Sequence, residues 1–317
     1  MVRLLVVALL LLPPAAALAQ PYGLRVDEEG RLLKDGKPYR GYGVNWYDVF
    51  LKLLADKNWT GYDSGFQQLA SAKIPFVRFI ACGFWPQDAR LYLDDPTEFF
   101  RRLDLIVRSA EQHGVGLIPS LFWHTPTVCD LVGETCDQWG NPQSKTREYM
   151  RRYVRDVVTR YQDSPAIWAW EFANEYNLGA NLPNAREHRP AVWPSLGTAA
   201  ARSEKDEWTY EIIRTVFAAF GQEVRKYDPY RPLSTGDSVV RAGAWHNWTE
   251  KTWGPDTLEQ QIEMTIADNP APVDLISVHI YPSALPQLPM AVQAAQRMRK
   301  PLFVGEFGAP GPPDKSE

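Results

Sequence analysis

The chain of 317 residues is long enough for one large domain or two small ones, and its hydrophobic content of 45% is sufficient for a sizeable core. Its net charge of −4, without a basic stripe, argues against nucleic acid or an anionic membrane as a partner. The five histidines and three cysteines are scattered without metal-ligand spacing, so we expect neither a metal nor another cofactor.

Residues 1–19 have the pattern of a secretory signal peptide. Arg3 precedes an apolar run at 4–12, two prolines end that run, and Ala17-Leu18-Ala19 is a small-x-small cleavage site. Such a segment is removed on export, so we expect cleavage after Ala19 and a secreted or periplasmic protein. No later run is apolar over the length needed to span a bilayer. The mature chain is therefore expected not to be bound to a membrane. We also expect it to be a monomer.

Export permits disulfides, and two of the cysteines are suited to form one. Cys129 and Cys136 lie in one loop-like segment, close enough in sequence to bridge. Cys82 is then expected to be a small buried residue at a strand end.

The chain after the signal alternates between strand-like and helix-like segments. Residues 20–40 carry two turns with glycine between short β-like pieces, which predicts an N-terminal hairpin. The strand candidates that follow are 42–46, 74–80, 115–123, 166–173, 232–237, 273–281 and 301–306. The helix candidates between them are 64–73, 96–113, 150–161, 208–224, 257–267 and 290–298.

This alternation predicts a parallel sheet with helical crossovers, and its even spacing favours a closed (β/α)8 TIM barrel over a doubly wound sheet. We expect the barrel over residues 41–317. After the seventh strand only 309–317 follow Gly308, too few residues for an eighth strand and helix. We therefore expect a barrel truncated after the seventh strand; a variant that closes in another way is the alternative.

Two of the predicted strands end on a glutamate. The apolar run 166–173 is followed by Asn174 and Glu175, and the last strand ends on Glu306. Because parallel barrels carry their chemistry at the carboxyl ends of the strands, we expect both carboxylates at one mouth. Two such carboxylates are the minimum equipment for glycoside hydrolysis. Glu171 lies four residues before Glu175, roughly 13 Å along a strand, and is therefore expected to be a structural carboxylate.

With these motifs the chain resembles glycoside hydrolase family 5, the cellulase and mannanase family of the retaining (β/α)8 clan, over residues 42–308. The resemblance implies that Glu175 is the acid/base and that Glu306, in Val-Gly-Glu-Phe-Gly, is the nucleophile. It implies that Asn174 binds a sugar hydroxyl and that Arg78 holds the nucleophile ionised.

The resemblance also implies supporting roles for the His-x-Tyr motif of His279 and Tyr281, with the tyrosine donating to the nucleophile, and for His124 at the end of the third strand. Trp46 and Trp123 lie near strand tips and are candidates for stacking on sugar rings, with core packing as the alternative.

The residues themselves agree with these roles. A retaining mechanism requires two carboxyl groups about 5–5.5 Å apart, one of them ionised and the other protonated. We expect a drier setting and the neighbouring charge to keep Glu175 protonated. Two alternatives stay open: Arg78 could pair with Glu171, and His279 could be a core histidine with satisfied hydrogen bonds.

The sequence thus predicts a secreted retaining hydrolase of β-1,4-linked polysaccharide, an endo-β-1,4-glucanase first and an endo-β-1,4-mannanase second. The partner is then a polysaccharide or oligosaccharide. The alternative is a non-catalytic carbohydrate-binding barrel, which the missing eighth unit favours and the complete acid/base set opposes.

Overall fold

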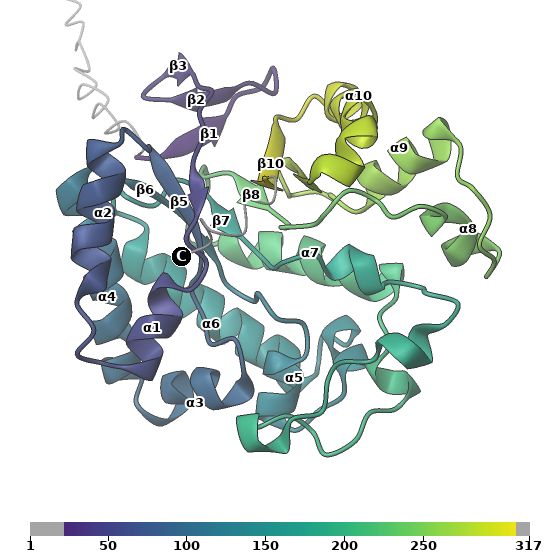
Figure 1. The fold of residues 1–317 in the computed structure, drawn as a ribbon, viewed down its shortest axis with the longest axis horizontal. Coiled ribbons are helices and arrows are strands. Elements are labelled where there is room, and N and C mark those ends of the chain that lie inside the picture. The colour runs from purple at the N-terminus through teal and green to yellow at the C-terminus, as the bar shows by residue number, and fades with distance from the viewer. Residues whose placement is uncertain (1–21, 309–317) are drawn as a thin grey trace, which may run out of the picture.

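The computed structural model describes residues 22–308 (Figure 1). The predicted signal peptide and the segment after Gly308 lie outside the described residues.

Seven parallel strands form the centre of the described part, in the order that the sequence predicts. Five of them pair in chain order: β4 (Val44–Asn45), β5 (Phe76–Ile80), β6 (Gly116–Ser120), β7 (Trp170–Glu171) and β8 (Leu233–Ser234). The other two, β9 (Ile276–Ile280) and β10 (Leu302–Phe307), pair with each other.

Hydrogen bonds connect these two groups of strands on either side. The backbone N–H groups of Asp274 and Leu275 donate to the carbonyl of Leu233 at 3.1 and 3.2 Å, which joins β9 to β8. The side chain of Asn45 donates to the carbonyl of Gly305 at 3.0 Å, which joins β4 to β10. The strands therefore form the α/β barrel layer of the predicted fold, with β10 next to β4.

Helices cover the outside of these strands in a broad arc (Figure 1). The best marked is α4, because the Asp95 side chain accepts from the N–H of Glu98 at 3.0 Å and Gly114 ends the helix with a φ of +68°. The helices are α1 (Val49–Ala55), α2 (Gly61–Ser71), α3 (Pro86–Asp94), α4 (Pro96–His113), α5 (Thr127–Val132), α6 (Lys145–Tyr161), α7 (Tyr210–Val224), α8 (Ala244–Thr249), α9 (Leu258–Ala267) and α10 (Leu288–Met298).

The predicted N-terminal hairpin is a three-stranded antiparallel sheet of β1 (Leu24–Val26), β2 (Leu32–Lys34) and β3 (Lys37–Pro38). It packs on Trp168, which precedes β7: the N–H of Leu24 donates to the Trp168 carbonyl at 3.1 Å. The sheet therefore lies at the amino ends of the barrel strands and leaves their carboxyl ends free.

A cluster of buried aromatic rings supports the carboxyl ends of β6 and β7. Phe172 follows β7, and its ring centroid lies 5.2 Å from those of Phe122 and Phe220 and 5.4 Å from that of Phe217. Burying each of these rings stabilises the folded state by about 1.5–3 kcal/mol. This packing against α7 fixes the strand end from which Glu175 projects.

No helix within residues 22–308 is both long enough and apolar enough to span a membrane.

The predicted bridge between Cys129 and Cys136 is absent, because all three cysteines are free, buried thiols. The segment is closed by other contacts. The N–H of Glu134 donates to the Cys129 carbonyl at 2.8 Å, and the N–H of Cys136 donates to Asp206 at 3.2 Å. Both side chains pack as small apolar groups, which is a common use of free cysteine.

Candidate active site

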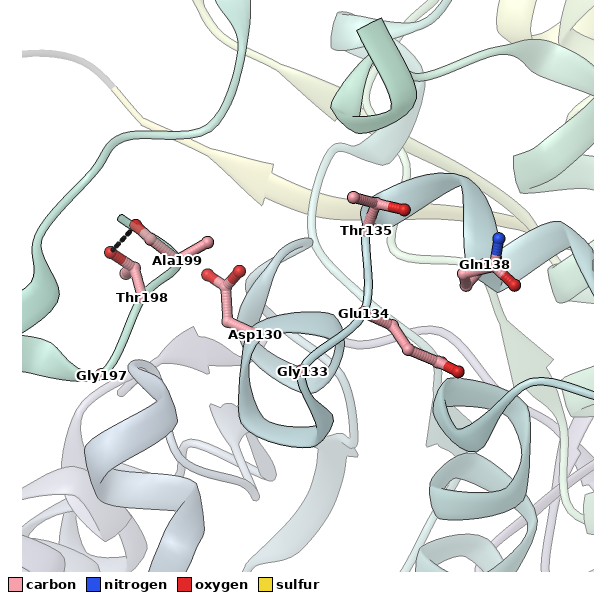
Figure 2. A pocket seen from close by; sticks show the side chains of 8 residues that line it. All are labelled: Asp130, Gly133, Glu134, Thr135, Gln138, Gly197, Thr198 and Ala199. Carbon is pink, nitrogen blue, oxygen red and sulfur yellow. Dashed lines mark hydrogen bonds between the residues drawn. The ribbon is translucent and has the colours of Figure 1, made fainter. Parts of the chain in front are cut away.

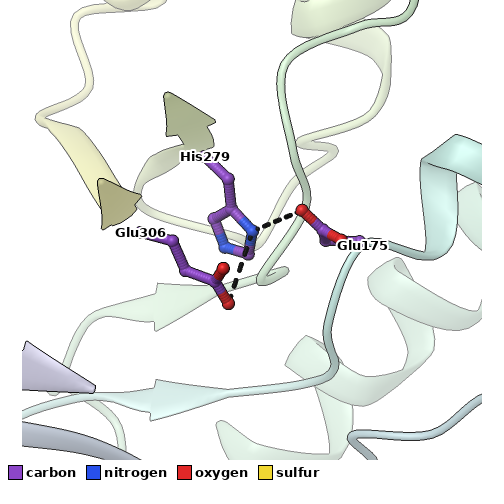
Figure 3. A group of neighbouring side chains, drawn as sticks. All are labelled: Glu175, His279 and Glu306. Carbon is purple, nitrogen blue, oxygen red and sulfur yellow. Dashed lines mark hydrogen bonds and ion pairs between the residues drawn. The ribbon is translucent and has the colours of Figure 1, made fainter. Parts of the chain in front are cut away.

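Glu175, His279 and Glu306 meet at the carboxyl ends of three strands. Glu175 follows β7, His279 lies in β9 and Glu306 in β10. One oxygen of each carboxylate and a ring nitrogen of His279 all lie within 4.8 Å of one another. Figure 3 shows the imidazole between the two carboxylates, with Nδ1 2.9 Å from Glu175 and 3.6 Å from Glu306. The structure thus brings together two glutamates that are far apart in sequence.

Arg78 lies beneath this group and contacts several side chains at once. It is 1% exposed, so its charge is almost completely removed from water. Nη1 donates to Glu306 at 2.8 Å, Nε to Glu171 at 2.7 Å and Nη2 to Asn174 at 2.9 Å. The ring of Trp123 lies 4.4 Å from the guanidinium carbon, in cation–π contact. The two partners that the sequence offered for Arg78 are therefore both present.

Glu171 is a fully buried carboxylate that shares this arginine. Its second oxygen accepts from the hydroxyl of Ser234 at 3.2 Å. A buried carboxylate needs a cation and hydrogen bonds, and Glu171 has both. The predicted structural role of Glu171 thus agrees with its contacts.

Tyr281 completes the surroundings of Glu306. Its hydroxyl donates to Oε2 of Glu306 at 2.7 Å, while Arg78 occupies Oε1. Partial burial and this hydrogen bond raise the pKa of Tyr281 to about 12. The phenol therefore stays protonated and can donate throughout the neutral and mildly alkaline range.

The expected protonation of Glu175 is wrong for the site as it stands. The hydrogen bond with His279 lowers the pKa of Glu175 below its ordinary range and outweighs its partial burial, which acts in the opposite direction. The charge of Arg78 contributes in the same direction as the histidine. Glu175 is therefore ionised at neutral pH while His279 contacts it.

The other three predicted site residues, His124, Trp46 and Trp123, make contacts with neighbouring side chains and backbone. The Nδ1 atom of His124 lies 3.2 Å from the carbonyl of Phe84 and its ring stacks on the Phe84 ring, and burial lowers the pKa of His124 to about 4. Trp46 packs against Trp59 and Phe66, at centroid distances of 6.3 and 5.5 Å. Trp123 covers Arg78. None of the contacts found for the described residues joins His124 to Glu175 or Glu306.

The Glu175–His279–Glu306 group offers one ligand atom from each side chain and could hold a metal ion by type of ligand. However, the Arg78 guanidinium lies 2.8 Å from Glu306 and repels a cation there. The sequence shows no metal-ligand spacing among these three residues, because they come from segments far apart along the chain.

An open pocket of about 510 Å³ lies between the two long loops that follow β6 and β7 (Figure 2). Its carboxylates are already engaged. Asp130 accepts two bonds of 2.6 Å from Arg202, and Glu134 accepts from the N–H groups of Lys145 and Thr146 at the start of α6. The lining residues are Asp130, Gly133, Glu134, Thr135, Gln138, Gly197, Thr198 and Ala199.

Sequence reasoning missed Asn45, which bonds to the Gly305 carbonyl beside Glu306. Its Oδ1 atom also lies 3.5 Å from Nη1 of Arg78. The signal was present in the sequence, because Asn45 is a polar residue at the tip of the first predicted barrel strand.

Fold and site together define a parallel α/β barrel whose strand tips carry two converging carboxylates, the arrangement of a barrel glycosidase. The family model described as cellulase (glycosyl hydrolase family 5) matches residues 34–314. The chain belongs to glycosyl hydrolase family 5.

Curated relatives match shorter parts of the chain. Mannan endo-1,4-beta-mannosidase A of Podospora anserina is 41% identical over 81 residues, 24% of this chain and 21% of that protein. Probable mannan endo-1,4-beta-mannosidase F of Neosartorya fischeri is 31% identical over 174 residues, 48% of this chain and 36% of that protein. The chain thus spans only about a fifth to a third of the curated relatives that it matches.

Solved structures match over most of the chain. The endo-1,4-beta-mannanase of Rhizomucor miehei has a TM-score of 0.60 and 18% identity, covering 90% of this chain and 82% of that chain. The endo-beta-1,4-mannanase of Thermotoga petrophila has a TM-score of 0.57 and 18% identity, covering 87% of this chain and 62% of that chain. At these identities the likeness establishes the fold.

Proposed function

We propose that this protein is a retaining glycoside hydrolase that cleaves internal β-1,4 linkages of a polysaccharide. The observation that carries the proposal is the approach of Glu175 and Glu306, whose nearest ligand oxygens lie within 4.8 Å. That spacing is compatible with the roughly 5–5.5 Å between the carboxyl groups of retaining enzymes and is shorter than the roughly 6.5–9.5 Å of inverting ones.

Mannan is the first candidate substrate and glucan the second, which reverses the order that the sequence suggested. The reason is that both curated relatives and both solved structures described above are named as mannanases or mannosidases.

The reaction proceeds by double displacement. A carboxylate oxygen of Glu306 attacks the anomeric carbon, the bond to the leaving oxygen breaks, and Glu175 gives that oxygen its proton. Glu175 then takes a proton from water, and the hydroxide displaces Glu306 with a second inversion. The free amide group of Asn174 is available for a sugar hydroxyl, because its Oδ1 atom already accepts from Arg78.

The first step requires the two glutamates to be in opposite protonation states. Arg78 and Tyr281 donate one hydrogen bond to each oxygen of Glu306 and so hold its carboxylate in a fixed position for attack. Glu175 requires a proton before the leaving group departs. Sugar bound over the half-buried Glu175 carboxyl excludes water and separates it from His279, and both effects raise its pKa.

The test measures release of reducing sugar from mannan and from carboxymethylcellulose. Glu306→Ala is expected to abolish turnover with little loss of polymer binding. Glu175→Ala should reduce turnover of the polymer by about 10²–10⁴-fold, the usual contribution of general acid catalysis. The control is Glu259→Ala, which removes an exposed glutamate of α9 paired with Arg297 and should leave turnover unchanged.

Unchanged turnover in Glu306→Ala would remove that residue from the proposed role. A wild-type protein that binds either polymer but releases no sugar would instead support the carbohydrate-binding alternative. Export is part of the proposal, and the mass of the purified mature protein would reveal whether residues 1–19 are removed.

A further inference from the structure

The backbone of Glu175 has an unusual conformation. Its φ and ψ are +56° and +34°, in the left-handed region, at the point where β7 leads into the short 3-10 helix Tyr176–Gly179. For a residue with a side chain this conformation costs about 1–2 kcal/mol. It also sets the direction in which the Glu175 carboxyl leaves the strand end. Contacts nearby must therefore hold it in place.

Four hydrogen bonds join this turn to the segment 236–238 at the end of β8. The N–H of Glu175 donates to the Gly236 carbonyl at 2.9 Å, and the N–H of Asn177 donates to the Asp237 carboxyl at 3.2 Å. The side-chain amide of Asn177 makes the other two: it donates to the Ser238 carbonyl at 2.9 Å and accepts from the Ser238 N–H at 3.2 Å.

The Asn177 amide thus replaces a backbone pair between two neighbouring strand ends. It is 2% exposed, so its donor and acceptor are both removed from water and both satisfied within the protein. The two segments also approach very closely: a Cβ atom on Gly236 would lie 1.9 Å from the Ala173 carbonyl oxygen. A side-chain amide fits this gap because it supplies both hydrogen bonds in one plane.

We propose that Asn177 is a positioning residue for Glu175, which it aims at the leaving oxygen by locking the turn 175–177 onto the segment 236–238. This inference rests on the proposed function, with Glu175 as the acid/base. The Asn177 side chain touches neither the Glu175 carboxylate nor the Glu306 carboxylate, and it acts through the backbone. A second contact, from the Tyr176 hydroxyl to the Phe122 carbonyl at 2.7 Å, keeps the turn attached when the amide is removed.

The test varies the leaving group of the substrate, which separates an effect on the position of the Glu175 carboxyl from an effect on folding. The substrates are a 2,4-dinitrophenyl β-mannobioside, whose phenolate leaves without a proton, and unactivated mannotriose, whose alcohol requires one. The substitution Asn177→Ala should lower kcat/KM on mannotriose at least about tenfold more than kcat/KM on the activated substrate. A general acid contributes about 10²–10⁴-fold to the rate, and misplacing Glu175 should remove part of that contribution. Azide should restore part of the lost kcat on the activated substrate, because it attacks the glycosyl-enzyme in place of water and needs no general base.

Asn177→Asp and a control variant keep the result interpretable. The substitution Asn177→Asp retains the acceptor and loses the donor. It should therefore also lower kcat/KM more on mannotriose than on the activated substrate, but by a smaller factor than Asn177→Ala. The control is Asn247→Ala, which removes an equally buried amide that bonds to Arg241 and the Thr252 carbonyl of another loop. It should alter both substrates by the same factor.

Equal losses on both substrates in the Asn177 variants would overturn the positioning role, even if the protein is destabilised. If Asn177→Ala does not fold, Asn177→Asp decides by the same ratio. A wild-type protein that hydrolyses neither substrate would instead contradict the proposed function, so the two failures are distinguishable.

Discussion

Nη1 of Arg78 lies 2.8 Å from Oε1 of Glu306. The same guanidinium holds Glu171, a carboxylate with no exposure to solvent, through its Nε atom at 2.7 Å. One buried cation therefore serves two carboxylates, one at the barrel mouth and one inside the barrel. Its removal affects folding through Glu171 and turnover through Glu306.

Arg78→Met is expected to destabilise the protein by about 3–5 kcal/mol, because it leaves Glu171 buried without a cation. Urea denaturation measures this loss. The double variant Arg78→Met/Glu171→Met should recover most of the stability, since no unpaired charge remains inside. Its turnover should stay low, because Glu306 still lacks its partner. A double variant as unstable as the single one would contradict this division of roles.

Tyr281→Phe should lower kcat/KM without impairing folding. The hydroxyl donates to the charged Glu306 carboxylate, and such a bond contributes about 1.5–3 kcal/mol, or about 10- to 150-fold in rate if the transition state requires it. Because the pKa of Tyr281 is raised to about 12, its ionisation does not shape the rate between pH 5 and 10. The variant and the wild type should therefore share the same alkaline limb, and a shifted limb would argue against this assignment.

The contact of His279 with Glu175 predicts a pH effect. The hydrogen bond from His279 is the largest cause that lowers the pKa of Glu175 from its ordinary value of 4.5. In His279→Ala that pKa should rise, so the alkaline limb of kcat/KM, which reports the acid in the free enzyme, should move to higher pH. His279→Gln can still donate from its amide and should shift the limb less.

The same contact has a consequence for stability. A carboxyl with a lowered pKa stabilises the fold above its unfolded value and loses that contribution as the pH falls through the folded value. The stability difference between the wild type and His279→Ala should therefore shrink as the pH falls below 4.5. A difference that is constant from pH 7 to pH 3 would show that the hydrogen bond has no part in it.

The sequence was sufficient to predict the elements that share a strong pattern. Alternation of apolar residues along β5 and β9 placed Arg78 and His279 on the inward face, and abrupt polarity after two apolar strands marked Glu175 and Glu306. The helix α4 carried a cap, a proline and a glycine at the expected positions. Each of these signals depends only on residues that are close together in the chain, so it can be recognised in a single sequence.

What the sequence did not predict depends on contacts between distant segments. The direction of the Glu175 pKa shift follows from the place of the His279 ring, 104 residues away. The use of Asn177 depends on how closely Ser238 approaches it. The short helix α5 lies in a segment interpreted as a loop, because its six residues are too few to show a period. Such features are properties of packing.

The free thiols provide a prediction that separates the structure from the sequence-based expectation. Burial raises the pKa of Cys82 to about 12, and the hydrogen bond with Cys129 together with burial raises the pKa of Cys136 well above its usual range. Since thiolates are the reactive form, and since Cys129 is completely buried and closed to reagents, the native protein should react with none of its cysteines at pH 8. Unfolding in denaturant without a reductant should expose three reactive thiols per chain. A count of one would instead mean that Cys129 and Cys136 had formed the bridge expected of an exported protein, and Cys129→Ala, which leaves no partner for Cys136, should then raise that count to two.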